Sequence, residues 1–190
     1  DGLINDTSSI FTVRNSPIPY YVNDTNQAGD VYTTAPGSEL NNGITVTTPV
    51  HSVAAIIERF QLEGGDTVYV DTGYYELTSN IVVRGDDSGS ATSRVQIVGS
   101  TNQLAGGSRF HRLLEQPWST DPTNTTAVFE LDRVQHLAIS RVVLENANSG
   151  IYVLNSPPLD NNLYLHDLEI RDGGYYGMKM SGSFDNTLER

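Results

Sequence analysis

The feature that most constrains the fold is a set of four apolar residues that recurs at a constant distance along the chain. An apolar residue stands 26 positions after each of them. The pairs are Leu137 and Leu163, Ile139 and Leu165, Val142 and Leu168, and Leu144 and Ile170. A unit of this length cannot bury its own apolar side chains, so successive units must stack and cover one another. The repeat continues in Gly150–Val153 and Gly177–Met180, which are 27 positions apart.

Short apolar segments follow one another from residue 67 to the end of the chain. Turn-forming Gly, Asp, Asn and Ser residues bound them, which is typical of short buried β-strands. A further strand is expected near Phe110, inside an irregular excursion over residues 101–126. The other expected strands are Thr67–Val70, Ile81–Val83, Val95–Val98, Val128–Leu131, Leu137–Ile139, Val142–Leu144, Ile151–Val153, Leu163–Leu165, Leu168–Ile170, Met178–Met180 and the residues around Leu188.

Three short strands in each repeat unit predict an all-β fold, a right-handed parallel β-helix. The expected hand follows because the crossover between two parallel strands is right-handed in almost all proteins. A β-sandwich spaces its strands similarly and is the alternative. Since nothing in a sandwich requires four apolar positions to keep one offset, the repeat favours the β-helix.

The N-terminal part of the chain is organised differently. Residues 1–19 are rich in turn formers and prolines and are expected to be a linker, or the tail of a preceding module, with one apolar alternation at Ile10–Val13. The strand Tyr20–Val22 and a long surface loop up to Asn42 come next. Residues 20–190 are expected to form a single domain.

One amphipathic helix is expected over Val50–Phe60. Thr48 provides a candidate N-cap and Pro49 suits the first helical position. The spacing of three and four residues between apolar positions predicts that one face of the helix is buried. These positions are Val53, Ile56, Ile57 and Phe60.

The charge and composition limit the possible partners. The chain has 190 residues, with 23 Asp and Glu against 11 Lys and Arg, and its formal net charge of −12 opposes binding to the phosphates of nucleic acids. An acidic surface can instead attract divalent cations. No apolar stretch has the length of about 18 residues that predicts a membrane span, so no membrane insertion is expected. The chain has no cysteine, and its redox compartment is therefore not indicated.

A succession of features in the N-terminal part resembles a known family. The strand Tyr20–Val22, a Gly- and Asn-rich loop, a proline and the amphipathic helix precede Gly65–Val70, which is followed by Gly73 and Tyr75. This order is similar to the N-terminal cap of right-handed parallel β-helix domains of the pectin-lyase-like type, most of all to the β-helix segments of very large secreted bacterial multidomain proteins.

The resemblance covers residues 20–190 and has several implications. It implies that the helix plugs the N-terminal end of the β-helix, which would otherwise expose an unpaired edge. It implies a location outside the cell or on the cell surface. Because the chain begins at Asp1 without Met and ends inside an expected strand, it is also expected to be an excerpt of a longer protein with flanking domains, with the β-helix truncated at its C-terminal end.

The resembling family contains polysaccharide lyases, uronan C5-epimerases and non-catalytic modules, so the fold alone cannot decide the function. Lyases and epimerases need a positive group to neutralise the substrate carboxylate and a base to remove a proton. Exposed ion pairs of these residue types are also common in turns and contribute little to stability. The Asp-Pro-His motif of alginate epimerases is absent. The candidate residues are His166, Asp167, Arg171 and Lys179, with Asp172 beside them.

Adjacent tyrosines are candidates for binding carbohydrate. In a strand, at most one ring of each pair can point inward, so the other ring is free to stack on the face of a sugar. Tyr175 and Tyr176 form one such pair, and Tyr74 and Tyr75 form another.

Two turn-rich segments offer oxygen ligands for calcium. Gly85–Gly89 contains Asp86 and Asp87, and Asn23–Asp30 contains further carboxylates and amides. Neither segment fits the EF-hand pattern, and Asp and Gly are also ordinary turn formers. Calcium is therefore a candidate ligand, and no other cofactor is indicated.

These observations lead to two hypotheses for the function. The first is a non-catalytic β-helix module of a large extracellular or cell-surface protein, structural or adhesive, with a polysaccharide or cell-surface glycan as its partner. The alternative is the N-terminal part of a polysaccharide lyase or uronan C5-epimerase. The lack of a recognisable catalytic constellation favours the first hypothesis.

Overall fold

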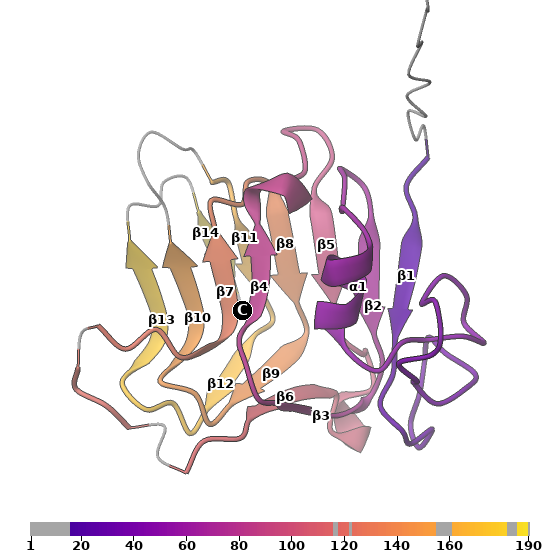
Figure 1. The fold of residues 1–190 in the computed structure, drawn as a ribbon, viewed down its shortest axis with the longest axis horizontal. Helices are drawn as coiled ribbons and strands as arrows, with labels where there is room; N and C mark the ends of the chain where they lie inside the picture. The colour runs from indigo at the N-terminus through magenta and orange to yellow at the C-terminus, as the bar shows by residue number, and fades with distance from the viewer. Residues whose placement is uncertain (1–15, 116–117, 122, 155–160, 182–185, 190) are drawn as a thin grey trace, which may run out of the picture.

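The computed structural model describes residues 16–115, 118–121, 123–154, 161–181 and 186–189, and this part of the chain is predominantly β (Figure 1). It contains one α-helix, α1 (Val53–Arg59), and two short 3₁₀ helices, η1 (Gly85–Asp87) and η2 (Gln103–Ala105). The strands are β1 (Pro19–Val22), β2 (Thr67–Val70), β3 (Gly73–Leu77), β4 (Ile81–Arg84), β5 (Val95–Val98), β6 (Ser108–Arg112), β7 (Ala127–Asp132), β8 (Leu137–Ser140), β9 (Val142–Glu145), β10 (Ser149–Leu154), β11 (Tyr164–His166), β12 (Glu169–Arg171), β13 (Tyr176–Ser181) and β14 (Thr187–Glu189).

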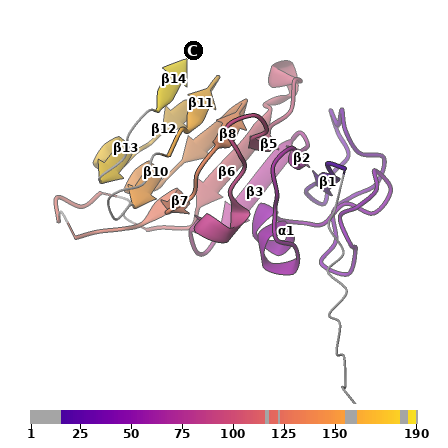
Figure 2. The same cartoon turned by 90° about the horizontal axis from the view of Figure 1, so that it is seen from above.

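These strands form three sheets, and neighbouring strands in each sheet are parallel. Sheet A has the order β1-β2-β5-β8-β11-β14, sheet B the order β12-β9-β6-β3, and sheet C the order β13-β10-β7-β4. From β2 to β14 the chain enters sheets A, B and C in turn. The colours in Figure 2 therefore run in one direction, from indigo at β1 to yellow at β14.

The strand register confirms the repeat seen in the sequence. Ile139 of β8 lies opposite Leu165 of β11, and Leu144 of β9 lies opposite Ile170 of β12. Ile151 of β10 lies opposite Met178 of β13. Because all these pairings are parallel, the β-sandwich alternative is wrong: its sheets are built from antiparallel strands.

The core consists of side chains that point inward from all three sheets and stack from strand to strand. In sheet A, Val68, Ile97 and Ile139 are in register and fully buried. Sheet B places Tyr75 next to Phe110, with ring centroids 5.2 Å apart, and Phe110 also meets Phe129 of sheet C at 5.4 Å. Burying a large apolar side chain stabilises a fold by about 1.5–3 kcal/mol, so these stacks account for much of the driving force.

The corners between sheets repeat as well. Arg141 and Asp167 both have positive φ angles, 57° and 53°, at the corner between sheets A and B. Asn146 and Asp172, with φ of 56° and 49°, occupy the corner between sheets B and C. Asn and Asp tolerate this left-handed conformation better than most residues, which explains their use at three of these four positions.

The α-helix is shorter than expected and begins later. It spans Val53–Arg59, and its N-cap is Ser52, whose side chain accepts a hydrogen bond from the backbone N–H of Ala55 at 3.2 Å. The prediction of Thr48 as N-cap was wrong. Val50 forms a parallel bridge with Val22 of β1, so its backbone is extended and the helix begins only after it. The helix packs against β2 and β4.

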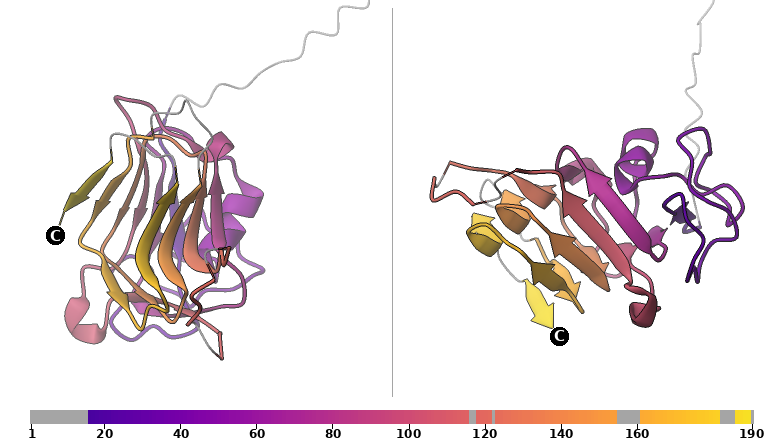
Figure 3. Two further views of the ribbon diagram at one scale, coloured as in Figure 1. Left: turned by 90° about the vertical axis from the view of Figure 1, so that its left-hand side faces the viewer. Right: turned by 90° about the horizontal axis from the view of Figure 1, so that it is seen from below.

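The motif Gly65–Tyr75 holds the N-terminal residues in place. The carboxylate of Asp66 accepts a hydrogen bond from the backbone N–H of Ile18 at 2.9 Å. The carboxylate of Asp71 accepts from the backbone of residues 31–33, at 2.7 to 2.9 Å. The long loop of residues 23–49, which lies at the indigo end near α1 in Figure 3, is therefore fixed by a side chain that the sequence places just after β2.

Two other expectations concern the strand near the N-terminus and insertion into a membrane. The proposed strand Ile10–Val13 lies outside the described residues. None of the helices in the described part of the chain combines the length and the apolar character needed to cross a bilayer.

Candidate functional site

The outer surface of sheet B carries two parallel rows of side chains, which we call the sheet B face. The strand register places four residues in each row, one from each strand. The alternation of side chains along a strand points both rows away from the core. The first row is Tyr74, Arg109, Val143 and Glu169, and the second is Glu76, His111, Glu145 and Arg171.

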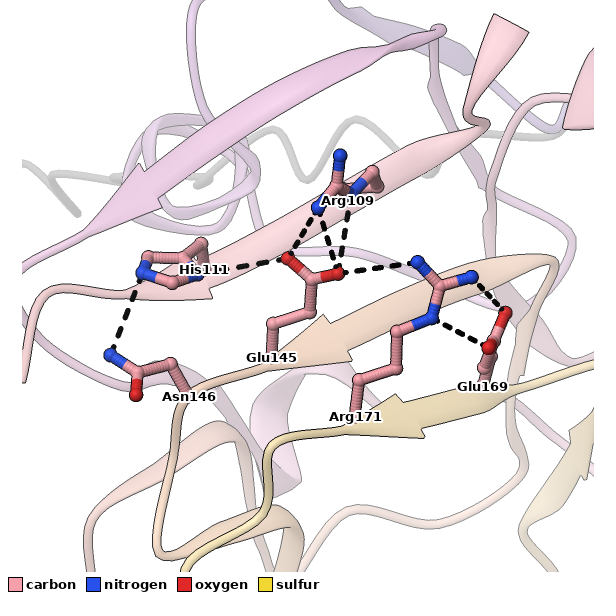
Figure 4. Close-up of polar contacts among 6 residues, drawn as sticks. All are labelled: Arg109, His111, Glu145, Asn146, Glu169 and Arg171. Atoms are coloured by element: carbon pink, nitrogen blue, oxygen red, sulfur yellow. Dashed lines mark hydrogen bonds and ion pairs between the residues drawn. The ribbon is translucent and has the colours of Figure 1, made fainter. Parts of the chain in front are cut away.

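Glu145 is the centre of this face and is nearly inaccessible, with 4% of its side chain exposed (Figure 4). The Nη2 of Arg109 donates to both carboxylate oxygens at 3.0 Å, and its Nε lies 3.2 Å from Oε1. Arg171 Nη1 lies 3.6 Å from Oε1, and His111 Nδ1 lies 3.6 Å from Oε2. A buried carboxylate is stable only when it is paired in this way, so Glu145 fixes the positions of the side chains around it.

Tyr74 provides an exposed aromatic ring next to this cluster. It is 41% exposed, whereas its neighbour Tyr75 is buried in the core, as the pairing of adjacent tyrosines predicted. The guanidinium of Arg109 lies 5.3 Å from the centroid of the Tyr74 ring, and the His111 ring lies 5.4 Å away. Partial burial, followed by the charge of Glu145, raises the pKa of Tyr74, so its hydroxyl remains a neutral donor and acceptor.

Arg171 also pairs with Glu169 on its own strand. Its Nε and Nη2 donate to the two oxygens of Glu169 at 2.6 and 2.7 Å. This hydrogen bonding lowers the pKa of Glu169, which stays ionised. Asn146 supports the other end of the cluster: its Nδ2 donates to the carbonyls of Arg112 and Leu114 and lies 3.5 Å from His111 Nε2 (Figure 4).

A depression of about 190 Å³ adjoins the first row on the side of β3. Asp24 and Arg109 lie on its walls, and Tyr74 borders it. The backbone of Gly73 forms part of its lining, and a Cβ at this position would lie 2.6 Å from Cγ of Asp24, so the close approach requires glycine.

A larger depression of about 560 Å³ lies along the starts of β9 and β12. Gln103 of η2, Arg141 and Asp167 line it, together with Val143 and Glu169 of the first row. The two depressions therefore extend the sheet B face into a broad surface with aromatic, cationic and carboxylate groups. Such a surface suits a ligand with many hydroxyls, because each planar polar group can donate or accept at a defined position.

Comparisons with protein-family models, with curated proteins and with solved structures found no match.

The structure does not gather the four candidate catalytic residues at one site. Arg171 belongs to the cluster around Glu145, and Asp167 lines the larger depression. His166 pairs with Asp167 at 2.9 Å and points outward from sheet A, where its ring stacks on Tyr164. Lys179 lies on sheet C, 5.0 Å from the ring centroid of Tyr152. Lys179 is thus separated from the other three.

The other candidate residues are also on sheet C or near α1. Tyr175 is 49% exposed and contacts Tyr176 edge to face, with centroids 4.5 Å apart, so this pair forms a second aromatic surface. Asp87 is buried and accepts hydrogen bonds from the backbone N–H groups of Leu62 and Arg84, at 3.0 and 3.5 Å. Burial raises the pKa of its carboxyl.

The expected calcium ligand Asp86 is exposed and stands next to Asp87 in η1. Within the described residues, no three His, Asp or Glu side chains are grouped closely enough to hold a metal on their own. Calcium at Gly85–Gly89 therefore stays a prediction.

Sequence reasoning did not single out several residues of the sheet B face, among them Arg109, His111 and Glu145. One signal was present, since Arg171 follows Glu145 by the repeat length of 26 residues. The other partners are 34 and 36 residues from Glu145, because the segment between β6 and β7 lengthens that repeat.

Proposed function

We propose that this protein is a non-catalytic carbohydrate-binding module, and that the sheet B face is its binding surface. The partner is a polysaccharide or cell-surface glycan, and the module belongs to an extracellular or cell-surface protein. We also propose that the three sheets wind as a right-handed parallel β-helix and that α1 caps its N-terminal end. The regular succession of strands through sheets A, B and C, and the packing of α1 on β2 and β4, support this arrangement.

The observation that carries the proposal is the exposed ring of Tyr74 beside the ordered polar groups around Glu145. A sugar has an apolar face of C–H groups and a rim of hydroxyls. Tyr74 offers the flat partner for the apolar face, and Arg109 and Arg171 offer guanidinium donors for the hydroxyls.

The geometry of the sheet supports an extended ligand. Neighbouring strands lie about 4.8 Å apart, so the four strands of sheet B present a surface of about 14 Å from β3 to β12. The two depressions lie along this direction, one bordering β3 and the other bordering β9 and β12. A polymer that crosses the strands would meet an equivalent position on each of them.

The charges on the face do not select strongly for an anionic polymer. Arg109 and Arg171 are balanced by Glu145 and Glu169, and the chain as a whole carries −12. We therefore expect binding to depend on shape and hydrogen bonds more than on long-range attraction, and to vary little with salt.

An enzymatic alternative is favoured by one observation: Arg141 and Asp167, which follow paired residues of β8 and β11, both line the larger depression. A guanidinium and a carboxylate are the group types that a polyuronate lyase or epimerase requires. Incubation with pectin and alginate, followed by ultraviolet absorbance for unsaturated products and by the epimer ratio, tests this alternative.

The binding proposal is tested on the 190-residue chain with a panel of neutral and acidic polysaccharides, first by affinity electrophoresis and then by calorimetry. We expect Tyr74→Ala to weaken binding by about two- to tenfold, since an aromatic contact is worth about 0.5–1.5 kcal/mol. Tyr74→Phe keeps the ring and is the matched control, with nearly unchanged affinity. Tyr175→Ala removes a somewhat more exposed ring on the second aromatic surface.

Two results would count against the sheet B face. One is unchanged affinity of Tyr74→Ala for a polysaccharide that the unaltered chain binds. The other is a loss of affinity in Tyr175→Ala alone, which would move the binding surface to sheet C.

A further inference from the structure

The smaller depression lies at the edge of sheet B. The strand β3 is an end strand of this sheet and pairs with β6. Successive N–H groups of a strand point to opposite edges. The N–H of Gly73 donates to Gly107 on the β6 side, so the N–H of Tyr74 points to the outer edge, where Asp24 accepts it at 3.0 Å. Residues 24–28 therefore cover the outer edge of β3, at the indigo end of the molecule in Figure 3.

This covering segment is held by hydrogen bonds at both of its ends. The Oδ1 of Asp24 accepts from the backbone N–H of Asn26 at 2.7 Å. The carbonyl of Gly29 accepts from Thr72 Oγ1 and from Asn102 Nδ2, both at 2.9 Å. The segment therefore forms a fixed boundary at this end of the sheet B face.

The space inside the depression suits one sugar ring. Its volume is about 190 Å³, whereas pockets for drug-sized ligands measure about 300–1,000 Å³. Gly106 and Gly107 line it with φ angles of 103° and 66°, so larger residues are disfavoured at both positions. A Cβ at Gly106 would meet only Cδ of Arg109, at 3.9 Å, so the space beside Gly106 is open. One small unit, and not a length of polymer, therefore fits.

The depression has groups that match the hydroxyls of a sugar. Each carboxylate oxygen of Asp24 accepts one backbone hydrogen bond and has capacity for another. Arg109 uses its Nε and Nη2 on Glu145, and among the described residues its Nη1 has no hydrogen-bond partner (Figure 4). An acceptor, a donor and the exposed ring of Tyr74 thus border a space for one ring.

We propose that the smaller depression binds the terminal sugar of a glycan, so that the sheet B face recognises chain ends and not chain interiors. The inference rests on the proposed carbohydrate binding by this face. A chain interior needs two ways out of the depression, and residues 24–28 close one of them. The rest of the glycan extends toward the larger depression, since Gln103 lines that one and the nearby Gly106 and Gly107 line the smaller.

The number of binding sites on a polysaccharide tests this proposal without any variant. The 190-residue chain is titrated by calorimetry with a polysaccharide from the panel, before and after partial depolymerisation, at equal sugar mass. Recognition of ends predicts that halving the mean chain length doubles the number of sites per gram. A constant number of sites per gram would overturn end recognition while leaving the sheet B face as the binding surface. Absence of binding to every polysaccharide of the panel would overturn both proposals.

A filled depression gives a second test. Ala28 is exposed and lines the depression, so Ala28→Phe adds a side chain where the terminal sugar is expected. We expect this variant to lose binding of the shortened chains and to keep the melting temperature of the unaltered chain. Thr25→Phe places the same ring on an exposed residue of the same segment, outside the lining, and is the matched control with unchanged binding. Unchanged affinity of Ala28→Phe would overturn the proposal.

Discussion

Two buried carboxylates, Asp71 in the N-terminal part and Glu145 on the sheet B face, have similar burial but different partners. Asp71 is fully buried and accepts five hydrogen bonds, four of them from backbone N–H groups and one from the hydroxyl of Thr33. Glu145 is held by the side chains of Arg109, Arg171 and His111. Backbone donors cannot turn toward a ligand, whereas long side chains can. The type of partner, and not the burial of the acid, therefore distinguishes an architectural carboxylate from one that organises a surface.

The largest effect on stability is expected when Asp71 is replaced. We expect Asp71→Ala to reduce the free energy of unfolding by about 3–5 kcal/mol, because it leaves several buried N–H groups without an acceptor. Denaturant unfolding measures this loss, and amide hydrogen exchange should show the largest loss of protection at residues 31–33. Thr33→Val removes only one of the five donors and should cost far less. Stability close to that of the unaltered chain in Asp71→Ala would mean that the loop is held by other contacts.

Glu145 is expected to give a smaller effect of another kind. Glu145→Gln keeps the shape but removes the charge, and we expect it to reduce stability by about 1–3 kcal/mol because Arg109 loses its ionic partner. The same change should weaken polysaccharide binding, since the guanidinium beside Tyr74 is no longer held in place. Protection of residues 31–33 should not change. A loss of protection there would show that both carboxylates stabilise the same cooperative unit and that the distinction between them is not valid.

Much of the strand arrangement could be predicted from the sequence because it depends on local pattern and constant spacing. The offset of 26 residues between Ile139 and Leu165, and between Leu144 and Ile170, is the observed register of sheets A and B. The strand β3 was not predicted, because Gly73 and the successive residues Tyr74, Tyr75 and Glu76 do not read as an apolar alternation. The strand β3 forms because it pairs with β6, a contact between distant residues that the local sequence pattern does not show.

The start of the helix and the candidate site depend on contacts that spacing does not reveal. Thr48 and Pro49 are residue types that favour the start of a helix, but Val50 forms a bridge with Val22, so Ser52 is the N-cap. In the site, Arg109 and Glu145 come from adjacent strands but are 36 residues apart in the chain, outside the repeat length. Only the contact between Glu145 and Arg171, which are one repeat apart, could have been predicted from the sequence. Arg171 was selected as a candidate for its charge and not for this partner.

The smallest effect is expected for the exposed pair of Arg171 and Glu169. Arg171→Ala removes a side chain that is 46% exposed, and exposed ion pairs contribute little, so the midpoint of denaturant unfolding should hardly change. Asp132→Asn, which weakens the pair of Asp132 with Arg133 on sheet C, is the matched control for stability. Polysaccharide affinity should separate the two variants, because Arg171 lies 3.6 Å from Glu145 and Asp132 lies on another sheet. If Arg171→Ala lowered stability as strongly as Asp71→Ala, its guanidinium would be an architectural partner of Glu145, and the distinction between the two buried carboxylates would not hold.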